Sequence, residues 1–125
     1  MSRTGSRLVA ALLLAGALAS CGGSGDAEVI DQLRAAGADL SRAREVRYYL
    51  YLPSEDQANE VADRVADRNR SVEVAPSADG SEWLVLVTEI AIVDEATMEA
   101  RRAEFESAVS DAGGEYDGWE AAVDP

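Results

Sequence analysis

Two strand–helix–strand patterns follow one another between residues 45 and 123, and their order restricts the fold more than any other feature of the chain. The predicted strands cover residues 45–52, 71–75, 82–92 and 115–123, with one helix after the first strand and one after the third. Two successive split β-α-β units of this length are typical of a ferredoxin-like α+β sandwich. The sequence therefore predicts a four-stranded antiparallel sheet with two helices on one face.

The two strands richest in apolar residues are expected to be central, and the other two to be edges. Glu45 to Leu52 alternates as a strand, with Val46, Tyr48, Leu50 and Leu52 on one face. The run Trp83 to Val87 has no polar member, which indicates a strand covered on both faces, and Leu86 is expected to be fully buried. The face without helices is expected to hold Tyr49, Tyr51, Trp83, Val85 and Val87.

Both helices of this domain have an N-cap candidate, Ser54 in one and Asp94 in the other. Arg101 and Arg102 interrupt the apolar stripe of the second helix, and their stems are expected to lie along its rim. An additional amphipathic helix is predicted at Asp26 to Ala36, within a segment 26–44 that precedes the domain. Its stripe of Val29, Ile30 and Leu33 is expected to cover part of the sheet face without helices.

The first 20 residues have the layout of a lipoprotein signal peptide. Arg3 and Arg7 precede an apolar run from Leu8 to Ala19, and small residues stand directly before Cys21, the only cysteine. In signals of this kind the cysteine thiol receives a diacylglycerol and the chain is cut before it. Residues 21–25 would then be a flexible Gly/Ser linker. The sequence thus predicts lipidation at Cys21 and an extracytoplasmic protein held at a bacterial cell envelope.

The charge balance limits the partners that the chain can bind. All 24 acidic residues follow the predicted signal, the 11 basic residues are all Arg, and His is absent. Such a surface repels phosphate backbones and anionic lipid head groups, so direct nucleic-acid binding is not expected and membrane attachment would come from the lipid. A basic protein partner would be attracted, although an acidic surface also serves solubility alone.

The residue types also argue against catalysis. Without His or Lys the chain has no Ser-His or Cys-His system and no Schiff-base lysine. Close carboxylates such as Glu115 and Asp117 are expected by chance among so many acids, and we expect no catalytic residue, metal or cofactor. A weak oxygen-ligand cation site near Glu115, Asp117 and Glu120 is left open by the sequence, although it has no calcium-loop pattern.

Several phrases of the sequence resemble the RraB family over residues 29–123. These phrases are Asp39 to Arg47, Tyr49 to Ser54, Val72 to Ser77 and, most specifically, Gly113 to Glu120. The best-known members of the family are protein inhibitors of ribonuclease E. The resemblance implies a ferredoxin-like fold over residues 45–123 and a non-catalytic protein that binds another protein.

The resemblance leaves several functional alternatives open. The signal peptide favours an extracytoplasmic target other than ribonuclease E, which works in the cytoplasm. The alternatives are a cytoplasmic ribonuclease E inhibitor with a misassigned signal, a carboxylate-based or metal-dependent enzyme, and an envelope structural protein. The candidate partner-binding residues are Tyr49, Tyr51, Glu115, Tyr116, Asp117 and Trp119. The last four belong to the signature phrase, for which an edge strand that closes the fold is the favoured interpretation over a binding patch.

Overall fold

The computed structural model describes residues 17–19 and 25–123, and the predicted lipidation site Cys21 lies outside them. The elements are β1 (Ala17–Ala19), α2 (Asp26–Ala35), β2 (Arg44–Leu52), α3 (Glu55–Val65), β3 (Arg70–Pro76), β4 (Trp83–Ala91), α4 (Glu95–Ser110) and β5 (Glu115–Ala122). Among the described residues, no helix is long and apolar enough to cross a membrane.

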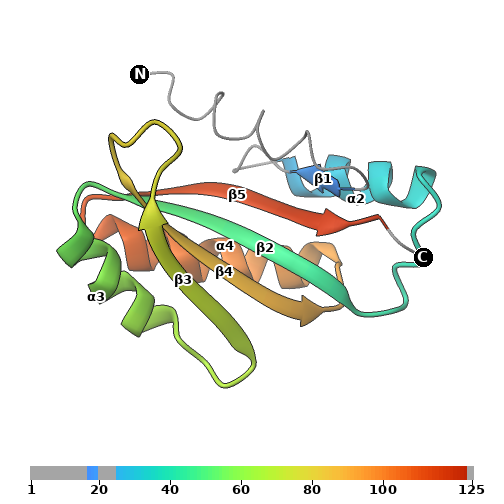
Figure 1. Ribbon diagram of the computed structural model, residues 1–125. Coiled ribbons are helices and arrows are strands. Elements are labelled where there is room, and N and C mark those ends of the chain that lie inside the picture. The colour runs from blue at the N-terminus through green and yellow to red at the C-terminus, as the bar shows by residue number, and fades with distance from the viewer. Residues whose placement is uncertain (1–16, 20–24, 124–125) are drawn as a thin grey trace.

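The sheet is antiparallel throughout and has the strand order β1-β5-β2-β4-β3 (Figure 1). The four strands β5-β2-β4-β3, with α3 and α4 in the connections between them, form the predicted ferredoxin-like sandwich. The two most apolar strands, β2 and β4, are central, as expected. The fold class that the sequence predicted is therefore confirmed.

One strand of the sheet was not predicted. β1 lies within the expected signal peptide and pairs antiparallel with β5, with Ala17 opposite Ala122 and Ala19 opposite Glu120. The last strand is therefore not a free edge along this stretch, which corrects the sequence-based expectation. The apolar run of a signal contains no pattern that distinguishes a strand from a helix, so the pairing could not be anticipated.

The helix starts follow from local sequence. The Ser54 hydroxyl accepts a hydrogen bond from the Gln57 backbone N–H at 3.3 Å, and the Asp94 carboxylate accepts one from that of Thr97 at 2.7 Å. Both caps satisfy amides that the first helical turn leaves without partners. The apolar side of each helix then packs on the sheet, with Val61 of α3 and Phe105 of α4 almost fully buried.

Strand pairing corrects the predicted faces of β4. Val87 lies opposite Tyr48 and Val85 opposite Leu50, so both valines face the helices and have no exposed surface. Leu86 lies opposite Tyr49 on the other face and is only half-buried. The expectation that Leu86 is fully buried is therefore wrong. Five consecutive apolar residues contain no alternation, so only pairing with β2 fixes which ones face the core.

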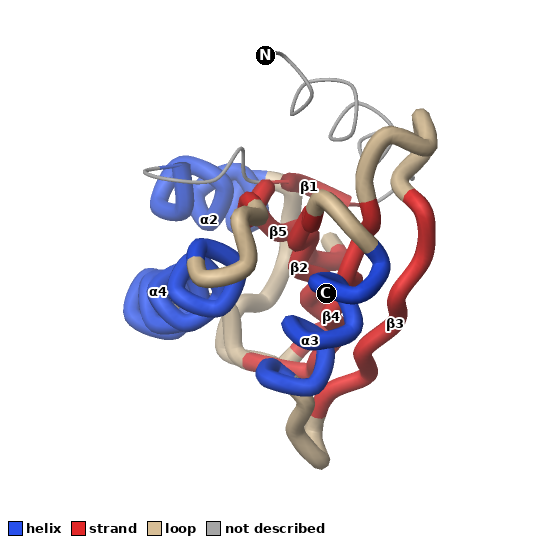
Figure 2. Tube along the Cα trace, turned by 90° about the vertical axis from the view of Figure 1, so that its left-hand side faces the viewer, coloured by secondary structure: helices blue, strands red, loops and turns tan. Residues whose placement is uncertain are grey.

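The position of α2 also differs from the expectation. Figure 2 shows α2 beside α4, on the same side of the sheet, and the two helices pack against each other. Val29, Ile30 and Leu33 are buried there, in one core with residues of α4 and β5. The prediction that this helix covers the opposite face is wrong, because an amphipathic stripe specifies burial but not the surface against which it is buried.

Because the side chains of Leu50 and Leu86 lie on opposite faces of the sheet, truncating them should lower the free energy of unfolding by different amounts. We expect Leu50→Ala to lower the free energy of unfolding by about 2–5 kcal/mol, because Leu50 is fully buried between sheet and helices. The matched variant Leu86→Ala should cost only about 1 kcal/mol, because its side chain is half-buried on the other face. Urea unfolding of both variants measures the difference, and equal costs would contradict the register of β2 and β4.

Candidate functional site

The signature phrase forms β5, and a β-bulge determines where its side chains point. Tyr116 pairs with Leu50 and Gly118 pairs with Tyr49, which leaves Asp117 as the extra residue. Tyr116 and Trp119 are three residues apart and would face opposite sides of a regular strand. The bulge lets both face the helices, where they are 8% and 1% exposed.

The glycine of the signature is required by this bulge. Gly118 has a φ of 116°, a backbone conformation that residues with a Cβ rarely adopt. Its positive φ accompanies the change in register between Tyr49 and Leu50. The order Tyr-Asp-Gly-Trp thus encodes a kinked strand that carries two aromatic anchors on one face.

The two aromatic residues of β5 connect the sheet to both neighbouring helices. Trp119 donates a hydrogen bond from its indole N–H to the Asp26 carboxylate at the start of α2, at 2.9 Å. Arg102 of α4 donates to the other oxygen of Asp26. Tyr116 packs against Phe105 of α4 with 5.8 Å between ring centroids. The structure therefore gives Trp119 and Tyr116 packing roles, whatever partner the protein binds.

The remaining candidates lie around the face of the sheet that points away from the helices. The Tyr49 hydroxyl donates to the Glu120 carboxylate at 2.5 Å, and Arg47 lies 3.7 Å from the same oxygen. Tyr51 lies opposite Glu115, and Asp117 is 1% exposed at the bulge. The sequence-predicted residues thus divide between two faces. Tyr116 and Trp119 face the helices, and Tyr49, Tyr51 and Glu115 lie on the opposite face of the sheet.

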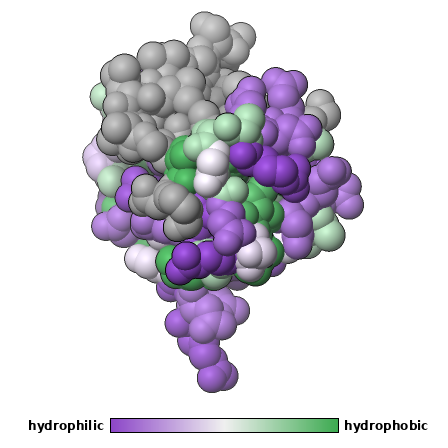
Figure 3. All heavy atoms as spheres, turned by 90° about the vertical axis from the view of Figure 1, so that its right-hand side faces the viewer, coloured by the Kyte–Doolittle hydropathy of each residue, from purple (hydrophilic) through white to green (hydrophobic). Residues whose placement is uncertain are grey.

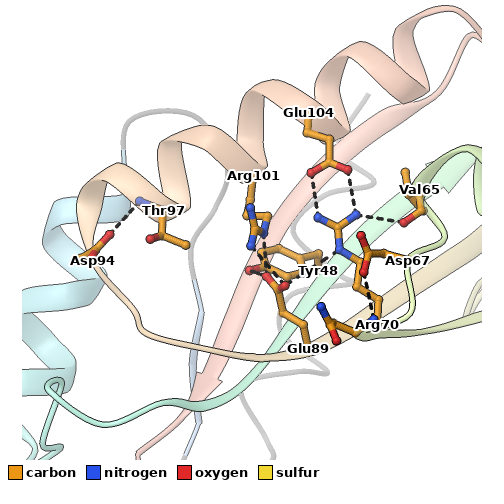
Figure 4. Close-up of polar contacts among 10 residues, drawn as sticks. Tyr48, Val65, Asp67, Arg70, Glu89, Asp94, Thr97, Arg101 and Glu104 are labelled. Atoms are coloured by element: carbon orange, nitrogen blue, oxygen red, sulfur yellow. Dashed lines mark hydrogen bonds and ion pairs between the residues drawn. The ribbon is translucent and has the colours of Figure 1, made fainter.

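A second polar cluster, which we call the Glu89 cluster, was missed from the sequence and lies between sheet and helices (Figure 4). The carboxylate of Glu89 accepts hydrogen bonds from the Tyr48 hydroxyl at 2.5 Å and from Arg101 Nε at 2.7 Å. Arg70 reaches the same carboxylate at 3.9 Å and makes two hydrogen bonds with Glu104, at 2.7 and 2.8 Å. The available signal was an acid within an apolar strand and an arginine within the apolar stripe of α4.

Burial and pairing shift several pKa values in these clusters. Burial, reinforced by the hydrogen bond to Glu89, raises the pKa of the Tyr48 phenol, and burial likewise raises that of Tyr116. The hydrogen bonds from Arg70 lower the pKa of Glu104. Glu89 accepts hydrogen bonds from Tyr48 of β2 and Arg101 of α4 and makes a longer ion pair with Arg70 of β3. This arrangement holds elements together and offers no free acid–base pair.

The structure does not assemble the cation site that the sequence left open. Within the described part of the chain, no group of three or more acidic, His or Cys side chains could hold a metal ion. Glu120 uses one carboxylate oxygen, Oε1, for both Tyr49 and Arg47, as described above. The three acids near the bulge therefore do not form a ligand set for a cation.

The ion pairs turn basic side chains inward and leave acids outside. Both arginines of α4 contact buried carboxylates, Arg101 that of Glu89 and Arg102 that of Asp26. The exposed carboxylates of α4 include Glu95, Glu99 and Glu106. Figure 3, which views the molecule from the right-hand side of Figure 1, shows hydrophilic side chains around a smaller hydrophobic area at that end of the molecule. The outer surface of the helical layer is therefore more acidic than its sequence suggests.

Fold and site together define a small ferredoxin-like domain that is held together by buried ion pairs. The family model for regulator of ribonuclease activity B, RraB, matches residues 24–121. The chain belongs to the RraB family, a family of regulatory proteins. Among curated proteins, no match to the chain was found.

The bulge provides a test of the signature. We expect Gly118→Ala to lower the free energy of unfolding by about 1–3 kcal/mol, because a Cβ is strained at the positive φ of this residue. Chemical denaturation followed by tryptophan fluorescence measures the change. An unchanged midpoint would contradict the bulge and, with it, the inward position of both Tyr116 and Trp119.

Proposed function

We propose that this chain is a lipid-anchored, extracytoplasmic RraB-family protein that regulates a protein partner by binding it, without catalysis. The observation that carries the proposal is the position of the family match. It begins at residue 24, three residues after Cys21, and runs to residue 121. The signal-like segment thus precedes the residues that match the family and interrupts none of them.

Family membership suggests regulation of ribonuclease E activity, and the proposed location changes the target. A protein that is lipidated at Cys21 after export does not meet a cytoplasmic enzyme. The acidic side chains of α3 and α4 favour a basic partner. Residues 22–25 would form a short tether that keeps the domain close to the membrane, with the lipid rather than the acidic surface supplying the attachment.

Lipidation is tested at the cysteine itself. The wild-type chain should incorporate a fatty-acid analogue and lose residues 1–20, because Cys21 would accept the diacylglycerol before cleavage. Cys21→Ala should be unlabelled and uncut, since the thiol that receives the lipid is gone. Gel fluorescence and the intact mass measure both steps. A wild-type chain that is neither labelled nor cut contradicts the proposal.

The target is tested by affinity capture of the full chain with a C-terminal tag from detergent-solubilised envelopes. We expect a basic envelope protein whose capture falls as salt rises from 0.1 to 1 M. Over this range the Debye screening length shortens from about 10 to about 3 Å, which weakens attraction between opposite charges. Purified ribonuclease E, added as a competitor, should leave the capture unchanged. Capture of ribonuclease E by unlipidated full-length chain from the cytosol would instead support the cytoplasmic regulator.

A further inference from the structure

The outer edge of β5 is a strand-binding site that the chain itself occupies. β1 pairs with it antiparallel over three residues, Ala17 with Ala122, Leu18 with Ala121 and Ala19 with Glu120. The family match begins at residue 24, so β1 lies outside the regulatory domain. The domain therefore carries an edge that accepts an added strand from outside its own fold.

Processing would vacate this edge. The present inference rests on the proposed function, in which residues 1–20 are removed at Cys21. Cleavage there would take β1 away and leave the backbone N–H and C=O groups that face outward between Glu120 and Ala122 without strand partners. Such an edge is a template for an extended peptide, which binds through main-chain hydrogen bonds.

A side chain at this edge defines the chemistry of the strand that fits. Residues opposite each other in an antiparallel pair have adjacent side chains, so the residue in the place of Ala19 lies beside Glu120. Glu120 is 3% exposed, and its Oε1 accepts from Tyr49. Its Oε2 has no hydrogen-bond partner among the described residues. A guanidinium or ammonium group at that position would supply the missing donor.

The opposite edge of the sheet lacks these properties. β3 ends in Pro76, which has no N–H to donate, and its Ser71 and Glu73 side chains are exposed. Pro and exposed charged residues are common devices that prevent an edge from pairing. The two edges of the same sheet therefore differ, and among the described residues a strand is added at the β5 edge only.

We propose that the mature protein binds an extended segment of its partner as an added strand, antiparallel to β5, with an Arg or Lys side chain opposite Glu120. β1 occupies this edge in the precursor and keeps it from pairing until the signal is removed. At this site the backbone of β5 would pair with the added strand, and the acidic side chain of Glu120 would favour a basic residue on it.

The probe is a fluorescent peptide with the sequence of residues 15–20, made with Ala19→Arg or with Ala19→Glu. Its anisotropy is measured with the processed, lipidated protein in detergent. We expect the Arg peptide to bind about tenfold more tightly than the Glu peptide, because attraction to Glu120 replaces repulsion. Backbone N-methylation of the Arg peptide should weaken its binding by about tenfold or more, because strand pairing needs its N–H groups.

Two variants locate the charge preference. Glu120→Gln should reduce the Arg-over-Glu preference to about twofold or less, because the carboxylate is lost while an oxygen remains for Tyr49. Glu73→Gln removes the same charge from β3 at the other edge of the sheet, where Glu73 lies opposite Leu86, and should leave the preference unchanged. The Cys21→Ala precursor, which retains β1, should bind the Arg peptide about tenfold more weakly than the processed protein.

The outcomes separate this inference from the proposed function. Fatty-acid labelling and the intact mass of the same preparation report lipidation and cleavage independently of peptide binding. A labelled, cut protein that binds no peptide, or binds it regardless of charge and N-methylation, overturns the docking edge alone. A protein that is unlabelled and uncut overturns the proposed function and the removal of β1 with it.

Discussion

The β-bulge at Asp117 and Gly118 is the constraint on which the rest of the domain depends. It turns Tyr116 and Trp119 to the same face of β5, although they are three residues apart. Tyr116 then packs on α4 through Phe105, and Trp119 reaches Asp26 at the start of α2. One extra residue in the last strand therefore connects that strand to two helices, including the one that precedes the family's β-α-β units. A regular strand would turn one of the two rings away from the core.

Buried ion pairs connect the same elements and shape the outer surface. Glu89 contacts Tyr48 of β2, Arg101 of α4 and Arg70 of β3, and Asp26 contacts Arg102 of α4 and Trp119 of β5. Buried carboxylates of this kind are costly unless donors surround them, which explains why arginines occupy a stripe of α4 that is otherwise apolar. Those arginines direct their hydrogen bonds inward to Glu89 and Asp26, while acids beside them such as Glu99, 3.9 Å from Arg102, remain exposed on the outside. Internal stability and external acidity thus have a common origin.

The position of β5 gives it a second role beside packing. One of its edges pairs with β2 in the interior of the sheet, while the other accepts β1 from outside the family domain. Glu120 lies on this strand and points away from the helices, beside Tyr49 and Arg47. The signature phrase is therefore at once a core element and a boundary of the sheet. Protein binding and fold closure, which appear as alternatives when only the sequence is considered, are compatible in this strand.

Periodicity and capping are local properties, so the order of the elements, the caps at Ser54 and Asp94, the central strands and the fold class could be predicted from the sequence. It also carried the family resemblance through the Gly113 to Glu120 phrase. Only the tertiary structure decided the face of Val85 and Leu86, the position of α2 and the partners of Glu89 and β5. A uniformly apolar strand has no alternation that predicts which side chains face the core, and an amphipathic helix does not indicate the surface against which it packs. The inward position of Arg101 is explained only by its carboxylate partner, Glu89, which lies on another element, β4. These features depend on register and packing between residues far apart in the chain, which no local pattern encodes.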